Sequence, residues 1–286
     1  MGPDAFTLFG FPIKYYSLMY ILALLVAIRV GKYEAKKYGI APKLIEEAGT
    51  WVIFSGIIGA RITYIIGEWS YYKDNLIEII AIWRGIRGLA IHGGILGAAI
   101  GILLFSRKYK ISVWRIFDIA VAPTLLGQAF GRIGNLMNGE AHGVPTFTPL
   151  KVLLKSNFSQ WWLVNKDKVD LNLKELVPWG IVFPPGTPAG DEFPNIPVHP
   201  TMIYEMILNV IGAALLFFYF RKKDMPSGYL AAIYMIMYAV IRTIVTIFRA
   251  DEWFVYGINV SILFNILFVM IALAVFYVRR GSKERL

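Results

Sequence analysis

The chain has 286 residues, of which 57% are hydrophobic and only 17% charged, and it carries a formal net charge of +10. Soluble domains contain about 25% charged residues. This composition, with several long apolar runs, excludes a soluble protein and predicts an all-α polytopic membrane protein. The runs are continuous rather than alternating, which disfavours a lipid-facing β-barrel. The chain has no cysteine, which excludes disulfides, catalysis by its own thiolate and cysteine-based metal sites.

Taken in chain order, about seven apolar segments approach the ~20 residues that a helix needs to cross the hydrocarbon core. We assign them to a single integral membrane domain of residues 1–286. The predicted transmembrane helices cover residues 12–30, 48–67, 89–105, 113–136, 201–220, 228–248 and 255–278.

Lysines and arginines gather in the short loops after the first, third, fifth and seventh spans, which hold 16 of the 29 basic residues. By the positive-inside rule, the N-terminus lies outside and the C-terminus lies in the cytoplasm. The net charge is therefore mostly a topology signal, and no nucleic-acid partner is expected. The residues concerned are Arg29, Lys32, Lys36, Lys37, Lys43, Arg107, Lys108, Lys110, Arg115, Arg221, Lys222, Lys223, Arg279, Arg280, Lys283 and Arg285.

Two segments on the predicted outer side are longer than simple turns. Residues 68–88 combine apolar side chains such as Leu76 and Ile77 with Lys73, a pattern typical of a helix lying along the membrane interface. We expect this segment to be an interfacial arm. Residues 144–198 form a longer insert with a proline-rich end, and we expect it to be an extracytoplasmic cap or arm.

Charged side chains inside the spans indicate where a functional site lies. An ionisable residue in a membrane segment costs roughly 2.5–3.5 kcal/mol on insertion scales. At about 1.5 Å per residue, Arg132, Arg242 and Arg61 lie about 28, 21 and 20 Å from the cytoplasmic ends of their spans. Spans that run inward carry their polar groups near their outer starts. Polar groups from six spans therefore reach the outer half of the bilayer, and those of the inward-running spans are Tyr16, His92 and Glu205.

The stretch GRIGNLMNGEAHG, Gly131–Gly143, places an arginine, two asparagines and a glutamate at the end of an apolar helix. Its glycines let the backbone approach another group closely. Arginine and amide donors beside exposed backbone N–H groups are suited to holding an anion, phosphate above all. The stretch is therefore the leading candidate for a phosphate site.

Helical spacing supports a site formed by several helices. Tyr238, Arg242, Thr246 and Arg249 follow i, i+4, i+8 and i+11 spacing, which predicts one helix face. In the preceding span, Glu205 and Asn209 lie one turn apart, after a His199–Pro200 start. The third span presents a small-xxx-small face on which another helix can pack closely, formed by Gly93, Gly97 and Gly101.

These residues together resemble the prolipoprotein diacylglyceryl transferases of bacteria. The stretch Gly131–Gly143 matches that family's signature, Gly-Arg-x-Gly-Asn-x-x-Asn-Gly-Glu-x-x-Gly, at every fixed position. The chain departs from the family at Thr246, where an acidic residue is usual, and at Ser17, where glycine is more common. The other landmarks are Tyr15-Tyr16 before Leu18-Met19-Tyr20, Gly59-Ala60-Arg61 with Tyr64, His92-Gly93-Gly94, His199-Pro200-Thr201 with Tyr204-Glu205, and Tyr238 with Arg242 and Arg249.

The resemblance implies transfer of the diacylglyceryl group from phosphatidylglycerol to the lipobox cysteine of a prolipoprotein signal peptide. A thioether forms and glycerol 1-phosphate leaves. It also implies a bacterial cytoplasmic (inner) membrane location, with the active site toward the outer leaflet and no cofactor. Since the chain has no cysteine, direct displacement by the substrate's thiol is the simpler expectation.

Roles follow from chemistry and resemblance together. Arginines stabilise charge on a departing phosphate, and histidine can accept the thiol proton because it ordinarily titrates near neutral pH. Glu140 could orient Arg132 or bind glycerol hydroxyls, and a role as a second base is the less favoured alternative. The candidate catalytic residues are His92, Arg132, Arg242 and Glu140, and the candidate substrate-binding residues are Tyr16, Arg61, Asn135, Asn138, Gly143, Glu205, Tyr238 and Arg249.

Structural alternatives stand beside these roles. Arg132 could clamp a helix end, Arg242 could form an ion pair with Glu205 or Glu140, and Arg61 could belong to a structural network. Tyr16 could belong to an aromatic belt, and Arg249 could mark the outer interface. His142 and His199 are interpreted as loop and helix-cap residues, and no metal site is expected. The Thr246 departure weakens the assignment of an ion pair to Arg242 within its own helix.

The main competing function is a transporter of an anionic substrate, because charges inside a membrane also mark substrate paths. Transporters usually place their sites near the midplane and show repeats, whereas this chain has an outward bias and no visible repeat. Another phospholipid-using enzyme would commonly need a metal-binding cluster or a nucleophile of its own. A purely structural protein is disfavoured by the arginines within the spans.

Overall fold

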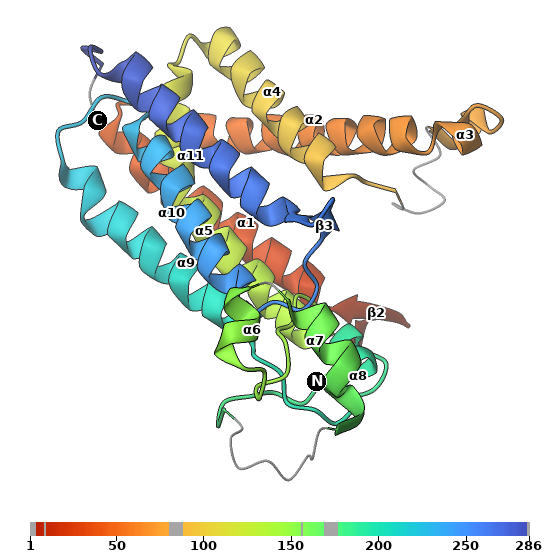
Figure 1. The fold of residues 1–286 in the computed structure, drawn as a ribbon. Helices are drawn as coiled ribbons and strands as arrows, with labels where there is room; N and C mark the ends of the chain where they lie inside the picture. Colours follow the sequence, from red (N-terminus) through yellow and green to blue (C-terminus); the bar gives the residue numbers. More distant parts are fainter. Residues whose placement is uncertain (1–3, 9, 80–87, 156, 169–176, 285–286) are drawn as a thin grey trace. The chain divides into compact units, whose positions relative to one another are not determined.

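The computed structural model describes residues 4–8, 10–79, 88–155, 157–168 and 177–284 (Figure 1). The chain divides into two compact units, one made of Met1–Ala27 and Ala120–Leu286 and the other of Ile28–Ile119. The assignment of residues 1–286 to one integral membrane domain stays a prediction.

Within the described residues, helices stand at all seven predicted positions. Five are long and apolar enough to cross a membrane: α2 (Lys43–Gly67), α5 (Val113–Asn138), the segment Thr201–Lys222 that contains α9 (Thr201–Phe218), α10 (Tyr229–Thr246) and α11 (Val260–Arg279). The other two are α1 (Tyr15–Lys37) and α4 (Ile91–Tyr109). The mostly helical membrane architecture is confirmed, while the count of seven spans and their orientation stay predictions.

In the unit Ile28–Ile119, α2 and α4 pack against each other through glycines. A Cβ atom at Gly97 would lie 2.2 Å from the Ser55 carbonyl oxygen, and one at Gly93 would lie 2.3 Å from the Gly59 carbonyl oxygen. Contacts this short leave no room for any side chain. The predicted small-residue face of the third span is therefore confirmed, and its partner is α2.

The segment that follows α2 differs from the prediction of one interfacial helix. Its described part forms two short helical turns, α3 (Trp69–Tyr72) and the 3₁₀ turn η1 (Leu76–Ile79), while residues 80–87 lie outside the described residues. Leu76 and Ile77 are exposed. Arg61 binds the backbone of this segment, because its Nε donates to the Ile79 carbonyl oxygen at 3.2 Å and its Nη2 donates to that of Glu78.

In the other unit, α9, α10 and α11 run side by side, with α5 joined to them through small residues (Figure 1). A Cβ atom at Gly212 of α9 would lie 3.2 Å from Leu125 of α5 and 3.1 Å from Met237 of α10. Gly212 thus lets three helices meet closely. This arrangement brings the polar positions of α5, α9 and α10 into one interior.

The described part of the insert 144–198 forms a cap at one end of these helices (Figure 1). Its described elements are α6 (Leu150–Leu154), α7 (Phe158–Asn165), the 3₁₀ turn η3 (Lys166–Lys168) and α8 (Pro188–Glu192). Phe183 and Phe193 of the insert form a buried cluster with Met202 of α9, against which Leu136 of α5 packs. Apolar burial of this kind holds the cap on the helices.

Two antiparallel hairpins were not predicted. Strands β1 (Asp4–Leu8) and β2 (Phe11–Lys14) pair before α1, and β3 (Phe254–Val255) and β4 (Ile258–Asn259) pair before α11. The predicted starts of the first and last spans, at residues 12 and 255, are therefore wrong. The last helix begins at Val260, where the Asn259 side chain accepts hydrogen bonds from the backbone N–H groups of Ser261 and Ile262 and caps the helix.

Candidate functional site

The signature stretch forms the last two turns of α5 and the turn that follows. Gly139 has a φ of +69°, which is the left-handed conformation that ends many helices. The Glu140 N–H donates to the Asn135 carbonyl oxygen at 2.9 Å, as in a Schellman motif. The chain therefore folds back on the helix it has just left, and the Glu140 side chain returns to the face that carries Asn135.

The carboxylate and amides of the signature hold its arginine. Glu140 accepts hydrogen bonds from Asn135 Nδ2 at 3.2 Å and from Asn138 Nδ2 at 3.3 Å. Asn135 Oδ1 in turn accepts a hydrogen bond from Arg132 Nη1 at 3.0 Å. Glu140 thus holds Asn135, which in turn holds Arg132, while the role of Glu140 in the reaction stays a prediction.

Glu205 of α9 lies between the two arginines that were predicted to contact phosphate. Its Oε1 is 2.6 Å from Arg132 Nη2, and its Oε2 is 3.8 Å from Arg242 Nη1. The Glu205 side chain is only 3% exposed. Three helices, α5, α9 and α10, therefore place their charged side chains at one point.

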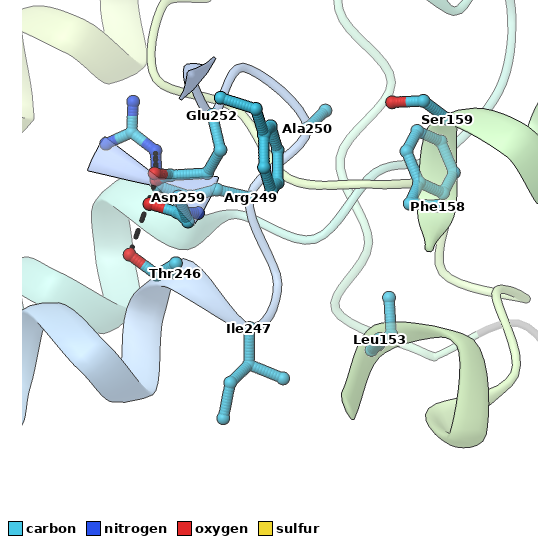
Figure 2. Close-up of a pocket in the computed structure, with 10 residues that line it drawn as sticks. Leu153, Phe158, Ser159, Thr246, Ile247, Arg249, Ala250, Glu252 and Asn259 are labelled. Carbon is cyan, nitrogen blue, oxygen red and sulfur yellow. Dashed lines mark hydrogen bonds and ion pairs between the residues drawn. The ribbon is translucent and has the colours of Figure 1, made fainter. Parts of the chain in front are cut away.

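Arg242 finds its closest carboxylate outside its own helix. Arg242 Nη2 lies 2.8 Å from Glu252 Oε1 and donates to Ser261 Oγ at 3.0 Å, while Ser261 Oγ donates to Glu252 Oε2 at 2.7 Å. The Thr246 hydroxyl donates weakly to the same carboxylate, at 3.4 Å. Figure 2 shows Thr246, Arg249 and Glu252 around one pocket. The chain lacks the acidic residue that is usual at Thr246, and the carboxylate beside Arg242 is instead that of Glu252. Glu252 was not among the residues predicted from the sequence.

Arg249 was expected on the same helix face as Arg242, and this expectation is wrong. Helix α10 ends at Thr246, so Arg249 lies in the turn beyond it. Its Nε lies 3.1 Å from Glu252 Oε1, and its Nη2 lies 2.7 Å from Asp251 Oδ2. Arg249 still reaches the site, through a carboxylate that it shares with Arg242.

Gly143 connects the signature to this turn through the backbone. It pairs with Arg249 in an antiparallel bridge, and its N–H donates to the His199 carbonyl oxygen at 3.0 Å. A Cβ atom at Gly143 would lie 2.5 Å from that oxygen and 2.7 Å from the Phe248 carbonyl oxygen. The structure thus supplies a packing reason for glycine here. The substrate-binding role of Gly143 stays a prediction.

Further residues of the same unit surround the charged group. The Tyr16 ring packs on α5 at Gly134, where a Cβ atom would lie 2.7 Å from the ring. Tyr238 of α10 packs edge-on against Phe268 of α11. Asn209, one turn after Glu205 on α9, is fully buried.

His92 and Arg61 belong to the unit Ile28–Ile119, so their roles at the site stay predictions. His92 is the second residue of α4 and is exposed. Arg61 has the backbone contacts described above, and its guanidinium also lies over the Tyr72 ring, with 5.2 Å between Cζ and the ring centroid. These contacts are those of the structural network that was the alternative role for Arg61.

The other two histidines, interpreted as loop and helix-cap residues, lie outside the helices, and the residue that caps α9 is Pro200 rather than His199. His142 Nε2 lies 3.0 Å from Glu192 Oε2, and His199 Nδ1 lies 3.1 Å from the Tyr204 hydroxyl oxygen. Burial lowers the pKa of His199, because desolvation disfavours the charged imidazolium. Among the described residues, no group of three or more histidines and carboxylates is arranged to hold a metal ion.

A small cavity of about 30 Å³ lies beside the charged group (Figure 2). Polar side chains line one part of it, and apolar side chains from the cap and the turn line the rest. Its lining residues include Thr246, Arg249, Glu252, Asn259, Ser159, Phe158 and Leu153. The cavity therefore joins the arginine site to the cap formed by the insert.

Comparison with known proteins gives a consistent result. The family model described as prolipoprotein diacylglyceryl transferase matches residues 3–278. The chain belongs to the prolipoprotein diacylglyceryl transferase family. Three relatives carry the name phosphatidylglycerol--prolipoprotein diacylglyceryl transferase. The protein of Fusobacterium nucleatum is 42% identical, with 99% of both chains covered. That of Lysinibacillus sphaericus is 32% identical over 90% of this chain and 84% of its own, and that of Synechocystis is 29% identical over 96% and 87%.

In this member of the prolipoprotein diacylglyceryl transferase family, the hydrogen bonds of Arg132 and Arg242 indicate which of their N–H groups can bind an anion. A guanidinium has five N–H donors. Within the described residues, Arg132 and Arg242 each donate two hydrogen bonds to protein partners. Both therefore keep donors for an anion while carboxylates fix their orientation. The site can bind a phosphate group and stabilise charge that develops on it.

Proposed function

We propose that this protein transfers the diacylglyceryl group of phosphatidylglycerol to the lipobox cysteine of a prolipoprotein. The observation that carries the proposal is the meeting of Arg132 and Arg242 at the buried carboxylate of Glu205. A relative that is 42% identical over 99% of this chain is named phosphatidylglycerol--prolipoprotein diacylglyceryl transferase. One line of support is the geometry of the charged side chains, and the other is sequence similarity.

The proposed reaction develops negative charge on a phosphate group, which arginine side chains can stabilise. The substrate sulfur forms a bond to a glycerol carbon while the bond from that carbon to the phosphate oxygen breaks. The electron pair of the broken bond leaves with glycerol 1-phosphate, and the thiol proton passes to a base. Negative charge thus grows on the departing phosphate, and oriented guanidinium groups stabilise that transition state. With no cysteine in the chain, the substrate's own thiolate acts as the nucleophile.

Other residues complete the proposed site. His92 is the proposed base, while Asn135, Asn138 and Glu140 fix the position of Arg132 and offer polar contacts to the headgroup. Tyr16 packs directly beside the signature, at Gly134, and is proposed to contact the lipid. Tyr238, Glu205 and Arg249 are proposed to line the same headgroup site.

We propose a bacterial inner-membrane location, with the N-terminus outside, the C-terminus in the cytoplasm and the site toward the outer leaflet. The support is the bias of lysines and arginines toward alternate loops. It agrees with the position of Arg132 near the end of α5 that lies away from the basic loop at Arg107–Arg115.

A purified assay tests the function. The protein in detergent is given phosphatidylglycerol labelled in its acyl chains and a lipobox peptide with either cysteine or serine at the acceptor position. We expect the cysteine peptide to gain a diacylglyceryl group, with one glycerol phosphate released per peptide, and the serine peptide to gain none. Folded protein that modifies neither peptide, but moves an anion across vesicle membranes, would overturn the proposal in favour of a transporter.

The base assignment has its own test. Replacing His92 by glutamine should lower turnover with the cysteine peptide while phosphatidylglycerol binding is largely kept. Turnover of the unmodified protein and of the variant is measured with the same peptide over a range of pH. Equal turnover by both proteins at every pH would remove His92 from the role of base.

A further inference from the structure

We propose that Glu252 is a positioning residue of the transfer site, which holds Arg242 and Arg249 in the orientation that the reaction needs. The inference rests on the proposed function and adds to it a residue from the loop after α10. Glu252 lies outside the signature and outside every transmembrane helix of the described structure. Its carboxylate nevertheless gathers the charged and hydroxyl groups of three chain segments.

The contacts of Glu252 occupy both of its oxygens. Oε1 lies 2.8 Å from Arg242 Nη2 and 3.1 Å from Arg249 Nε. Oε2 accepts a hydrogen bond from Ser261 Oγ at 2.7 Å. The carboxylate is only 4% exposed. A carboxylate with this burial and these partners is a fixed element of the site rather than a mobile surface charge.

The backbone holds Glu252 in place from both sides. Before it, Ala250 N–H donates to the His142 carbonyl oxygen at 3.2 Å, and the Gly143–Arg249 bridge binds the turn to the signature stretch. After it, Asn259 caps α11 and so fixes Ser261, the third partner of the carboxylate. The position of Glu252 is therefore determined by the same backbone that carries the signature.

This placement directs Arg242 toward the centre of the site. Glu252 and Ser261 both bind Nη2, and among the described residues Nη1 has no hydrogen-bond partner. Nη1 is instead the atom that lies 3.8 Å from Glu205 Oε2, on the side of Arg132. A planar guanidinium held along one edge presents its other edge in a defined direction. Without Glu252, Arg242 would keep its charge and lose that direction.

The experiment measures kcat/KM of several variants at equal amounts of folded protein. The variants remove the charge of the Glu252 side chain, shorten that side chain, or remove the charge of a carboxylate elsewhere in the chain. Glu252→Gln should lower kcat/KM for phosphatidylglycerol by about 10–100-fold. Glu252→Asp keeps the charge but shortens the reach, and should recover only part of the activity. Glu284→Gln is the matched control, because Glu284 pairs with Arg279 at 2.8 Å at the other end of α11, and it should leave kcat/KM unchanged.

A further variant moves the carboxylate from position 252 to position 246. Recovery of activity in it is expected if Glu252 positions the arginines, but not if Glu252 only stabilises the fold. The Thr246 hydroxyl lies 3.4 Å from Glu252 Oε1 and lines the cavity of about 30 Å³, so a longer side chain has room there. The kcat/KM of the double variant Thr246→Glu/Glu252→Gln should be at least tenfold higher than that of Glu252→Gln. Regained activity without any change in thermal midpoint would support positioning.

Three outcomes would overturn the inference. The first is a Glu252→Gln protein that keeps more than half of kcat/KM. The second is a loss of activity that only follows the loss of folded protein. The third is a folded double variant no better than Glu252→Gln. Failure of the proposed function is distinguishable, because then the unmodified protein itself transfers nothing to the cysteine peptide.

Discussion

Replacing Arg132 by alanine should abolish diacylglyceryl transfer while the protein still accumulates in the membrane. Arg132 Nη2 lies 2.6 Å from Glu205 and Nη1 lies 3.0 Å from Asn135, so the guanidinium is fixed where we place the phosphate. Removal of one oriented donor from a site that stabilises developing charge typically costs about 10²–10³-fold in turnover. The measurement is kcat with phosphatidylglycerol and the cysteine peptide.

Two variants make the Arg132 result interpretable. Arg132→Lys keeps the charge but loses the planar fork, and we expect it to retain only a small part of the activity. Arg280→Ala removes an exposed arginine after α11 and should be fully active. Equal solubility in detergent and equal elution volume identify folded protein. An Arg132→Ala protein that keeps most of its activity would exclude Arg132 from the phosphate site.

Replacing Glu205 by glutamine should destabilise the lipid-free protein. The change leaves Arg132 and Arg242 facing each other without the carboxylate that lies between them. Loss of one partner of a buried ion pair commonly costs about 3–5 kcal/mol, because a charge is left uncompensated. The midpoint of thermal unfolding in detergent should therefore fall, whereas the Glu284→Gln midpoint should fall much less, since that pair is more exposed.

The same variant also tests whether an anion occupies this place. Added phosphatidylglycerol should raise the midpoint of Glu205→Gln more than that of the unmodified protein, because a phosphate can take the position of the missing carboxylate. Phosphatidylcholine, which has no net charge, serves as the comparison lipid. Equal effects of the two lipids on Glu205→Gln would contradict an anion site between Arg132 and Arg242.

The signature and the helices could be predicted because they depend on local sequence. Val113 begins α5 as predicted, since the apolar run and its flanking polar residues mark a helix regardless of its neighbours. The glycine face of α4 was also readable, because its four-residue spacing matches the helical repeat. The hairpins before α1 and α11 were missed, because strands of two to five residues next to apolar helices resemble a continuation of the same apolar run.

The sequence by itself determined the membrane class, the positions of the long helices and the family, because apolar length and a contiguous signature are properties of the chain alone. The tertiary structure decided which carboxylate serves which arginine. Glu205 is 73 residues from Arg132, and Glu252 comes from a loop whose course depends on its pairing with Gly143 and His142. Ion pairs between distant segments are fixed by packing, and no periodicity in the chain encodes them.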